Sequence, residues 1–319
     1  MDPFVFLLVA GAAVLHVSWN VLLKTAGDPL RAAAVGMATA AAVICPVALV
    51  EWLRVGRPIL SGETLALSIA SGALEALYFG FLASAYRRGD LSLVYPLARG
   101  SAPLLAVAIG VVLLNERLGP VGYAGVAALL VGLLTLQRPW QYLRASGRAS
   151  SGAAGFALLT GVTIASYSAV DRVGVRGTTP WIYAGLIWAS CTVFLWSYVW
   201  VYRRRRAGGL AAAGRAAADP SAALPQPHAM PEADLEPASF SARRAGFGGL
   251  MTLGAYLLIL GAFTVAPLTA VAPLRESAIV LASGWGALRL REAADRSDAL
   301  QRLGSAGLVL IGALLLAID

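Results

Sequence analysis

Long apolar segments recur along the whole chain and set the strongest limit on its fold. Most have about the 20 residues that a helix needs to cross a bilayer. They are too long for strands and lack period-two alternation, so we predict helices, which satisfy their own backbone groups in lipid. The sequence therefore predicts an all-α integral membrane protein with ten transmembrane helices. The predicted spans are residues 4–23, 31–50, 65–86, 92–114, 119–137, 153–171, 181–201, 247–265, 270–290 and 303–318.

The composition agrees with a membrane protein. Only 13% of the 319 residues are charged and 58% are hydrophobic, whereas soluble domains have roughly 25% charged residues. The net charge of +8 comes mainly from arginines that cluster between the apolar segments. That pattern favours contact with membrane lipids and argues against nucleic acid as a partner. The two cysteines, Cys45 and Cys191, lie inside apolar segments without metal-ligand spacing, so we expect no metal and no cofactor.

One stretch does not fit a membrane. Residues 203–244 open with four arginines and continue with alanine, proline and scattered acids, and we predict a disordered loop there.

Most basic residues of the chain fall on one side of the predicted spans. The positive-inside rule places that side in the cytoplasm and both termini outside.

The two halves of the chain resemble each other. Residues 72–101 align with 249–277 at a displacement of about 177, so that Pro96 matches Pro273 and Arg99 matches Glu276. Because each half holds five predicted spans, an odd number, the second half has to insert with the opposite orientation. We therefore expect two inverted five-helix repeats, residues 1–150 and 151–319, with the loop inside the second.

The fourth segment, residues 94–118, carries two prolines and Arg99 and ends at Asn115-Glu116-Arg117, before a glycine-rich fifth segment. With the strings HVSWNVLLK and PLRESAIV, these features resemble the EamA-like family of the drug/metabolite transporter superfamily. The resemblance covers the chain apart from residues 203–244. It implies ten spans, two inverted repeats, a central cavity and alternating access without ATP. The charged string LRLREAADRSDALQ departs from its counterpart LLNERLGPVGYAG, so we expect the ninth-to-tenth connection to differ.

Four charged residues lie at membrane depth, where an unpaired charge is costly: Arg99, Glu75, Arg275 and Glu276. Arg99 and Glu276 occupy related positions with opposite charge. They either face the cavity or form a permanent ion pair that only fixes helix packing. Glu75 is the candidate carboxylate for proton coupling, because buried carboxyls serve as proton relays in transporters. A carboxylate held ionised by an arginine is the alternative.

A polar stripe runs along the first span. His16, Trp19, Asn20 and Lys24 share one helical face at spacings of three to four. They form either a cavity wall or a set of interhelical hydrogen bonds near the membrane boundary, with Lys24 reaching toward water.

Aromatic residues complete the predicted cavity, because amphipathic rings suit ligands of mixed polarity. Pro96 and Pro273 interrupt their helices and are candidate hinges for a change of access. The predicted cavity residues are Trp19, Asn20, Glu75, Tyr78, Tyr95, Arg99, Tyr167, Tyr256, Arg275 and Glu276.

These features predict a multi-pass secondary transporter of the cell inner membrane. Its small-molecule substrate is a metabolite or drug, and the resemblance favours export. A membrane protein that handles lipid or acts as a scaffold is the alternative. We do not expect an enzyme, because the chain has no metal-binding His cluster, no paired-Asp motif and no nucleotide-binding loop. A monomer and a homodimer both fit the sequence.

Overall fold

The computed structural model describes residues 2–24, 28–86, 88, 91–137, 151–217, 240–276 and 296–319. Over these residues the chain is helical and contains no strand, as predicted. Five helices, α2, α3, α7, α8 and α9, are long and apolar enough to cross a membrane, and shorter apolar stretches lie in α1, α4, α5 and α12. The elements are α1 (Pro3–Lys24), α2 (Pro29–Arg54), α3 (Gly62–Tyr86), α4 (Leu91–Val112), α5 (Pro120–Gln137), α7 (Ser151–Gly174), the 3-10 turn η2 (Val175–Gly177), α8 (Pro180–Ala217), α9 (Ala242–Val265), α10 (Leu268–Glu276) and α12 (Arg296–Ile318).

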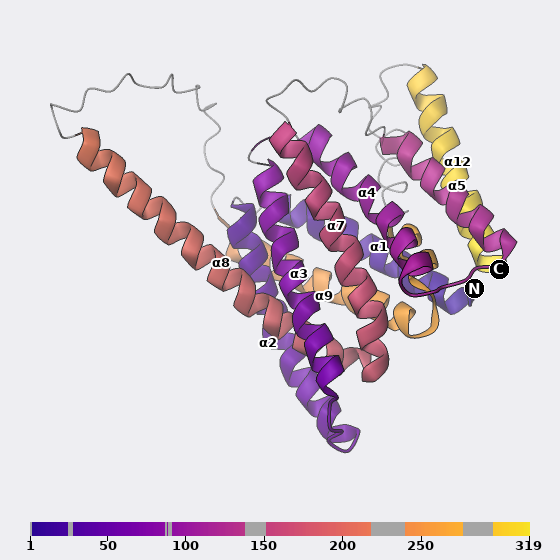
Figure 1. Ribbon diagram of the computed structural model, residues 1–319, viewed down its shortest axis with the longest axis horizontal. Coiled ribbons are helices and arrows are strands. Elements are labelled where there is room, and N and C mark those ends of the chain that lie inside the picture. The colour runs from indigo at the N-terminus through magenta and orange to yellow at the C-terminus, as the bar shows by residue number, and fades with distance from the viewer. Residues whose placement is uncertain are drawn as a thin grey trace.

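One predicted boundary changes, and one predicted span is only partly described. Helix α8 continues past the expected start of the loop at residue 203 to Ala217, and it projects beyond the bundle in Figure 1. Alanine and arginine are good helix formers, and extending an existing helix gains one hydrogen bond for each residue that is fixed. Residues 203–217, which were predicted to belong to a disordered loop, are therefore helical, and residues 218–239 lie outside the described residues. Most of the predicted span 270–290 also lies outside the described residues, which stop at Glu276 in α10.

The helix starts follow from local chemistry. Asp28 precedes Pro29, and its side chain accepts hydrogen bonds from the backbone N–H groups of Leu30 and Arg31, both at 3.1 Å. Ser241 accepts in the same way from the N–H of Arg244. These caps satisfy backbone donors that have no partner inside the helix.

The main packing contacts join the first half of the chain to the second. Helix α1 packs on α9, α2 on α8 and α9, α3 on α7 and α8, and α4 on α7 and α10. Helices α5 and α12 pair at one edge of the bundle, on the right in Figure 1. One buried core, with Trp188 and Tyr183 among its largest members, draws on both halves. The predicted halves therefore share their core.

Glycines allow the closest of these approaches. A Cβ built on Gly312 would lie 2.6 Å from the carbonyl oxygen of Gly125, and one built on Gly36 would lie 3.0 Å from that of Ala245. These contacts bring α5 against α12 and α2 against α9. Small residues have this role in membranes because no hydrophobic force drives apolar helices together there.

Replacing Gly312 with alanine should destabilise the α5–α12 pair. The added methyl would also lie 2.6 Å from the backbone nitrogen of Leu129, so the helices have to move apart. Overpacking of this kind costs about 1–3 kcal/mol. We expect a lower melting temperature for purified Gly312→Ala in detergent. The control is Gly307→Ala in the same helix, where a Cβ meets no described atom within 4 Å. Equal melting temperatures would contradict the close contact.

Candidate functional site

A central cavity lies where helices from both halves converge. Its volume, counted as the space open to the centres of water molecules, is about 50 Å³. One water needs roughly 10–15 Å³ on this measure, so the cavity holds a few waters in this conformation. It is lined by Ala12, His16, Trp19, Met37, Glu75, Tyr78, Phe79, Arg99, Tyr167, Thr252, Ala255, Tyr256, Ile259 and Arg275.

The cavity gathers those predicted residues whose side chains the structure describes. These are Trp19, Glu75, Tyr78, Arg99, Tyr167, Tyr256 and Arg275. Pro273 lies inside α10 and does not line the cavity. The side chains of Asn20, Tyr95, Pro96 and Glu276 lie outside the described part of the structure. That these residues bind a substrate stays a prediction.

Helical spacing explains how α1 and α9 supply half of the lining residues. Helix α1 presents Ala12, His16 and Trp19, which are four and three residues apart. Helix α9 presents Thr252 and Tyr256, again four residues apart, together with Ala255 and Ile259. Residues at this spacing form one stripe along a helix, and both stripes face the cavity.

On the basic side of the cavity, His16 lies between two donors. The indole N–H of Trp19 donates to His16 Nδ1 over 3.1 Å, and Nη2 of Arg99 lies 2.6 Å from His16 Nε2. Indole and guanidinium groups only donate, whereas a neutral imidazole has one accepting nitrogen. The two donors therefore compete for one acceptor. The expectation that Arg99 meets Glu276 falls on a side chain that is not described, but α4 does pack against α10.

The second guanidinium lies on α10. Nη1 of Arg275 donates to the hydroxyl of Ser168 over 3.3 Å, and its Cζ lies 5.9 Å from the ring centre of Tyr167. That distance is within the range of a cation–π contact. Arg275 is therefore held by α7 while it lines the cavity.

On the acidic side, Tyr256 binds the carboxyl group of Asp171. Its hydroxyl donates to Asp171 Oδ2. A second tyrosine, Tyr183, lies 3.4 Å from Asp171 Oδ1. The ring of Tyr256 packs edge-on against Trp188, with centroids 4.5 Å apart. This packing holds the tyrosine beside the Asp171 carboxyl.

Opposite charges balance around the cavity. Arg99, Arg275, Glu75 and Asp171 are between 1% and 9% exposed. Two guanidiniums and two carboxyls in one buried region lower the cost that any one of them would have alone. Among the described residues, no group of three His, Cys, Asp or Glu side chains is arranged as metal ligands are.

Sequence reasoning missed Asp171. It lies at the end of a predicted span and looked like the boundary of that span. The signal was present, because Tyr167 and Asp171 are four residues apart and share a helical face. An acid on the same face as a predicted cavity residue was a reason to include it.

A second, narrower cavity adjoins the first. Trp19, Met37, Phe79 and Thr252 line both. The second cavity continues along the first turns of α2 and α9, past Gly36 and Gly249, to Arg244. It therefore leads from the central cavity toward the end of the bundle where α2 and α9 begin.

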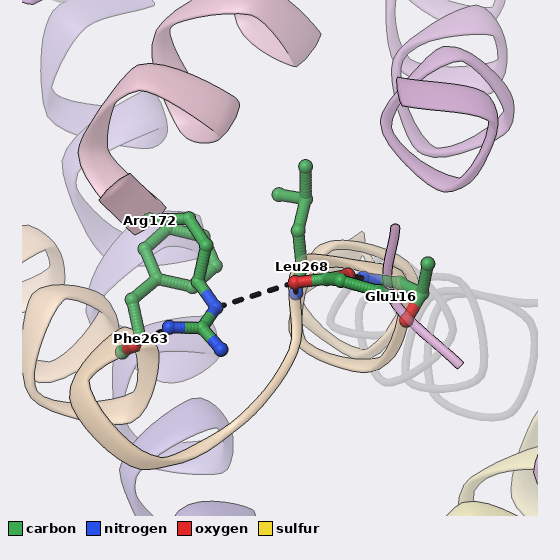
Figure 2. A network of polar contacts seen from close by, with 5 residues as sticks. Glu116, Arg172, Phe263 and Leu268 are labelled. Atoms are coloured by element: carbon green, nitrogen blue, oxygen red, sulfur yellow. Dashed lines mark hydrogen bonds and ion pairs between the residues drawn. The ribbon is translucent and has the colours of Figure 1, made fainter. Parts of the chain in front are cut away.

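The opposite end holds an interhelical cluster that we call the Glu116 clasp. It consists of the side chains of Glu116 and Arg172 and the backbone of Phe263, Leu268 and Thr269. Glu116 accepts from the N–H groups of Leu268 and Thr269 at 2.8 and 2.9 Å. Arg172 donates to Glu116 over 3.3 Å and to the carbonyl of Phe263 over 2.8 Å. Figure 2 shows how these groups meet.

The clasp gives the Asn-Glu string after α4 a structural role that the sequence did not reveal. Asn115 has a φ of 51°, a left-handed conformation that asparagine tolerates better than most residues. The chain then turns so that the N–H of Glu116 donates to the carbonyl of Gly110 over 2.9 Å. The Glu116 carboxylate thereby reaches the start of α10, where a negative charge suits the helix dipole.

Replacing Tyr256 with phenylalanine should destabilise the acidic side of the cavity. The change removes the hydroxyl that donates to buried Asp171, and an unsatisfied buried group costs about 1–3 kcal/mol. We expect a lower melting temperature in detergent. Tyr198→Phe is the matched control, because Tyr198 is 37% exposed on α8. A Tyr256→Phe protein as stable as that control would show that the hydrogen bond to Asp171 contributes little.

The comparisons with known proteins identify a fold and no family. No protein-family model matches the sequence, and no curated protein matches it. Among solved structures, the chain is similar to one described only as the crystal structure of a protein, with a TM-score of 0.65 and 18% sequence identity. The similarity covers 100% of this chain and 98% of that one. At this identity the likeness shows a shared fold over the full length of the chain.

Proposed function

We propose that the chain is a secondary transporter that moves a small polar organic solute across the cell inner membrane by alternating access. The observation that carries the proposal is the central cavity, which Arg99, Arg275 and Glu75 line while buried among apolar helices, with Asp171 bonded to the lining residue Tyr256. Ionisable groups at membrane depth are costly and mark solute or ion pathways. Membership of the EamA-like family and the direction of export belong to the same proposal.

The charged cavity favours transport over a scaffold. A scaffold needs only apolar packing between helices, which α5 and α12 supply through Gly125 and Gly312. The cavity instead places charged groups from α3, α4 and α10 around a space that admits water. This lining favours a polar solute over an acyl chain, because Glu75, Arg99 and Arg275 need polar partners.

The packing pattern supports ten spans in two inverted repeats. Each helix of the first half has a counterpart in the second, and the pairs are α1 and α7, α2 and α8, α3 and α9, α4 and α10, and α5 and α12. If each helix is replaced by its counterpart, the α3–α7 contact becomes the observed α9–α1 contact, and the α3–α8 contact becomes the observed α9–α2 contact. The pairs α2–α8, α4–α10 and α5–α12 convert into themselves. Such a relation between halves is typical of transporters with internal repeats, which bind solute at the repeat interface.

The donors around His16 indicate what the solute offers. A solute oxygen can accept from Arg99 in place of His16. His16 then accepts from Trp19, and the two donors no longer compete.

The present cavity volume of about 50 Å³ is too small for a metabolite. Binding therefore requires the helices around the cavity to separate, as alternating access demands.

Loss of Arg99 should abolish transport. A thermal-shift screen of purified protein against amino acids, nucleosides, sugars and cationic drugs selects the solute, and counterflow of that solute into proteoliposomes measures transport. We expect Arg99→Ala and Arg99→Lys to reduce counterflow at least tenfold, because lysine lacks the planar donor geometry of arginine.

Arg54→Ala is the control for that series, because the Arg54 side chain is 70% exposed at the end of α2. Counterflow at the level of the unmodified protein in both Arg99 variants would refute a role for the cavity arginine. Solute binding without any counterflow in the unmodified protein would favour a membrane protein that does not transport.

Proton coupling is the second expectation from this site. If Glu75 carries the proton, Glu75→Gln should reduce accumulation driven by an imposed pH gradient more than it reduces counterflow, which needs no gradient. Glu51→Gln, at an exposed helix end, should change neither. A pH gradient that drives no accumulation in the unmodified protein would exclude coupling to protons.

A further inference from the structure

We propose that the Glu116 clasp is a gate that closes one end of the central cavity. The inference rests on the proposed transport function and assigns a role in it to residues outside the cavity. The clasp joins the segment after α4 to the end of α7, the end of α9 and the start of α10. All four of these helices line the cavity.

The clasp lies directly beyond the cavity along the helix axes. Arg172 follows the cavity residue Tyr167 by five residues, which is about 7.5 Å at 1.5 Å per residue. Phe263 follows Ile259 by four residues, or about 6 Å. Leu268 precedes Arg275 by seven residues, or about 10 Å. The clasp contacts therefore hold α7, α9 and α10 together about one to two helical turns from the cavity lining.

The clasp is buried and depends on one carboxylate. The Glu116 and Arg172 side chains are each 9% exposed. Through Glu116, α4 is linked to two backbone donors at the start of α10 and to the guanidinium on α7. Arg172 in turn donates to the carbonyl of Phe263 in the last turn of α9. Removing the carboxylate releases the start of α10 and leaves a buried arginine with the Phe263 carbonyl as its remaining clasp partner.

A second, smaller cavity adjoins the other end of the central cavity and is lined by residues from Trp19 past Gly36 and Gly249 to Arg244. Among the described residues, the interhelical hydrogen bonds of the clasp therefore lie at one end of the central cavity, and this second cavity lies at the other. Opening the clasp gives the alternate access that a transport cycle needs.

The test measures access to the cavity separately from transport. A reporter cysteine replaces Ala255, which lines the cavity and takes no part in the clasp. Its background carries Cys45→Ala and Cys191→Ala, which removes both native thiols. The probe is a small, charged, membrane-impermeant methanethiosulfonate reagent. Its reaction rate is measured on right-side-out and inside-out vesicles, so that each face of the membrane is tested.

Without a clasp substitution, the reporter should react more slowly from the clasp face than from the opposite face. Glu116→Gln and Arg172→Gln should each raise the rate from the clasp face about tenfold, which corresponds to about 1.4 kcal/mol in the opening equilibrium. Glu51→Gln is the matched control, because it breaks an exposed ion pair with Arg54 at a helix end. It should leave the rate unchanged.

Arg172→Gln keeps the test decisive if Glu116→Gln does not fold, because Glu116 then still caps α10. Unchanged labelling in a folded, monodisperse clasp variant overturns the gate, whatever the counterflow assay shows. Faster labelling combined with no counterflow in the unmodified protein supports the gate as a closure of the cavity and refutes transport. The two proposals thus fail on different measurements.

Discussion

The cost of an unpaired polar group between apolar helices governs this structure. Water is scarce inside such a bundle, so each charge needs a partner from a neighbouring helix. Arg99 meets His16, Arg275 meets Ser168, and Tyr256 meets Asp171. The same requirement builds the Glu116 clasp, where one carboxylate satisfies two backbone donors and a guanidinium. Binding chemistry and helix positions therefore depend on the same contacts.

Close packing between the halves brings these partners within reach. The helices that carry the charges come from both halves of the chain, and the main contacts cross from one half to the other. Glycines such as Gly36, Gly249 and Gly312 let the backbones approach closely. A cavity between two interleaved halves can change shape when the halves move against each other, because no single half encloses it.

Much of the candidate site was predictable from residue type and depth. Arg99, Arg275 and Glu75 were found because charges are rare in apolar helices, and tyrosines such as Tyr256 because their rings suit a mixed lining. Asp171 was missed because it lies where a span was expected to end, so its depth was misjudged. Glu116 was recognised only as part of the polar string that ends the fourth segment. The N–H groups that it caps belong to a helix about 150 residues later in the chain, a separation that spacing alone does not bridge.

The sequence by itself determined the helical class, the positions of most helices and the residues that a bilayer would force to find partners. It did so because hydrophobic length and helical spacing are local properties. Only the tertiary structure decided which partners meet: His16 with Arg99, Tyr256 with Asp171, and Arg172 with Glu116. It also placed the clasp at one end of the cavity. Those pairings depend on how helices far apart in the chain cross, and that geometry follows from the packing of all of them together.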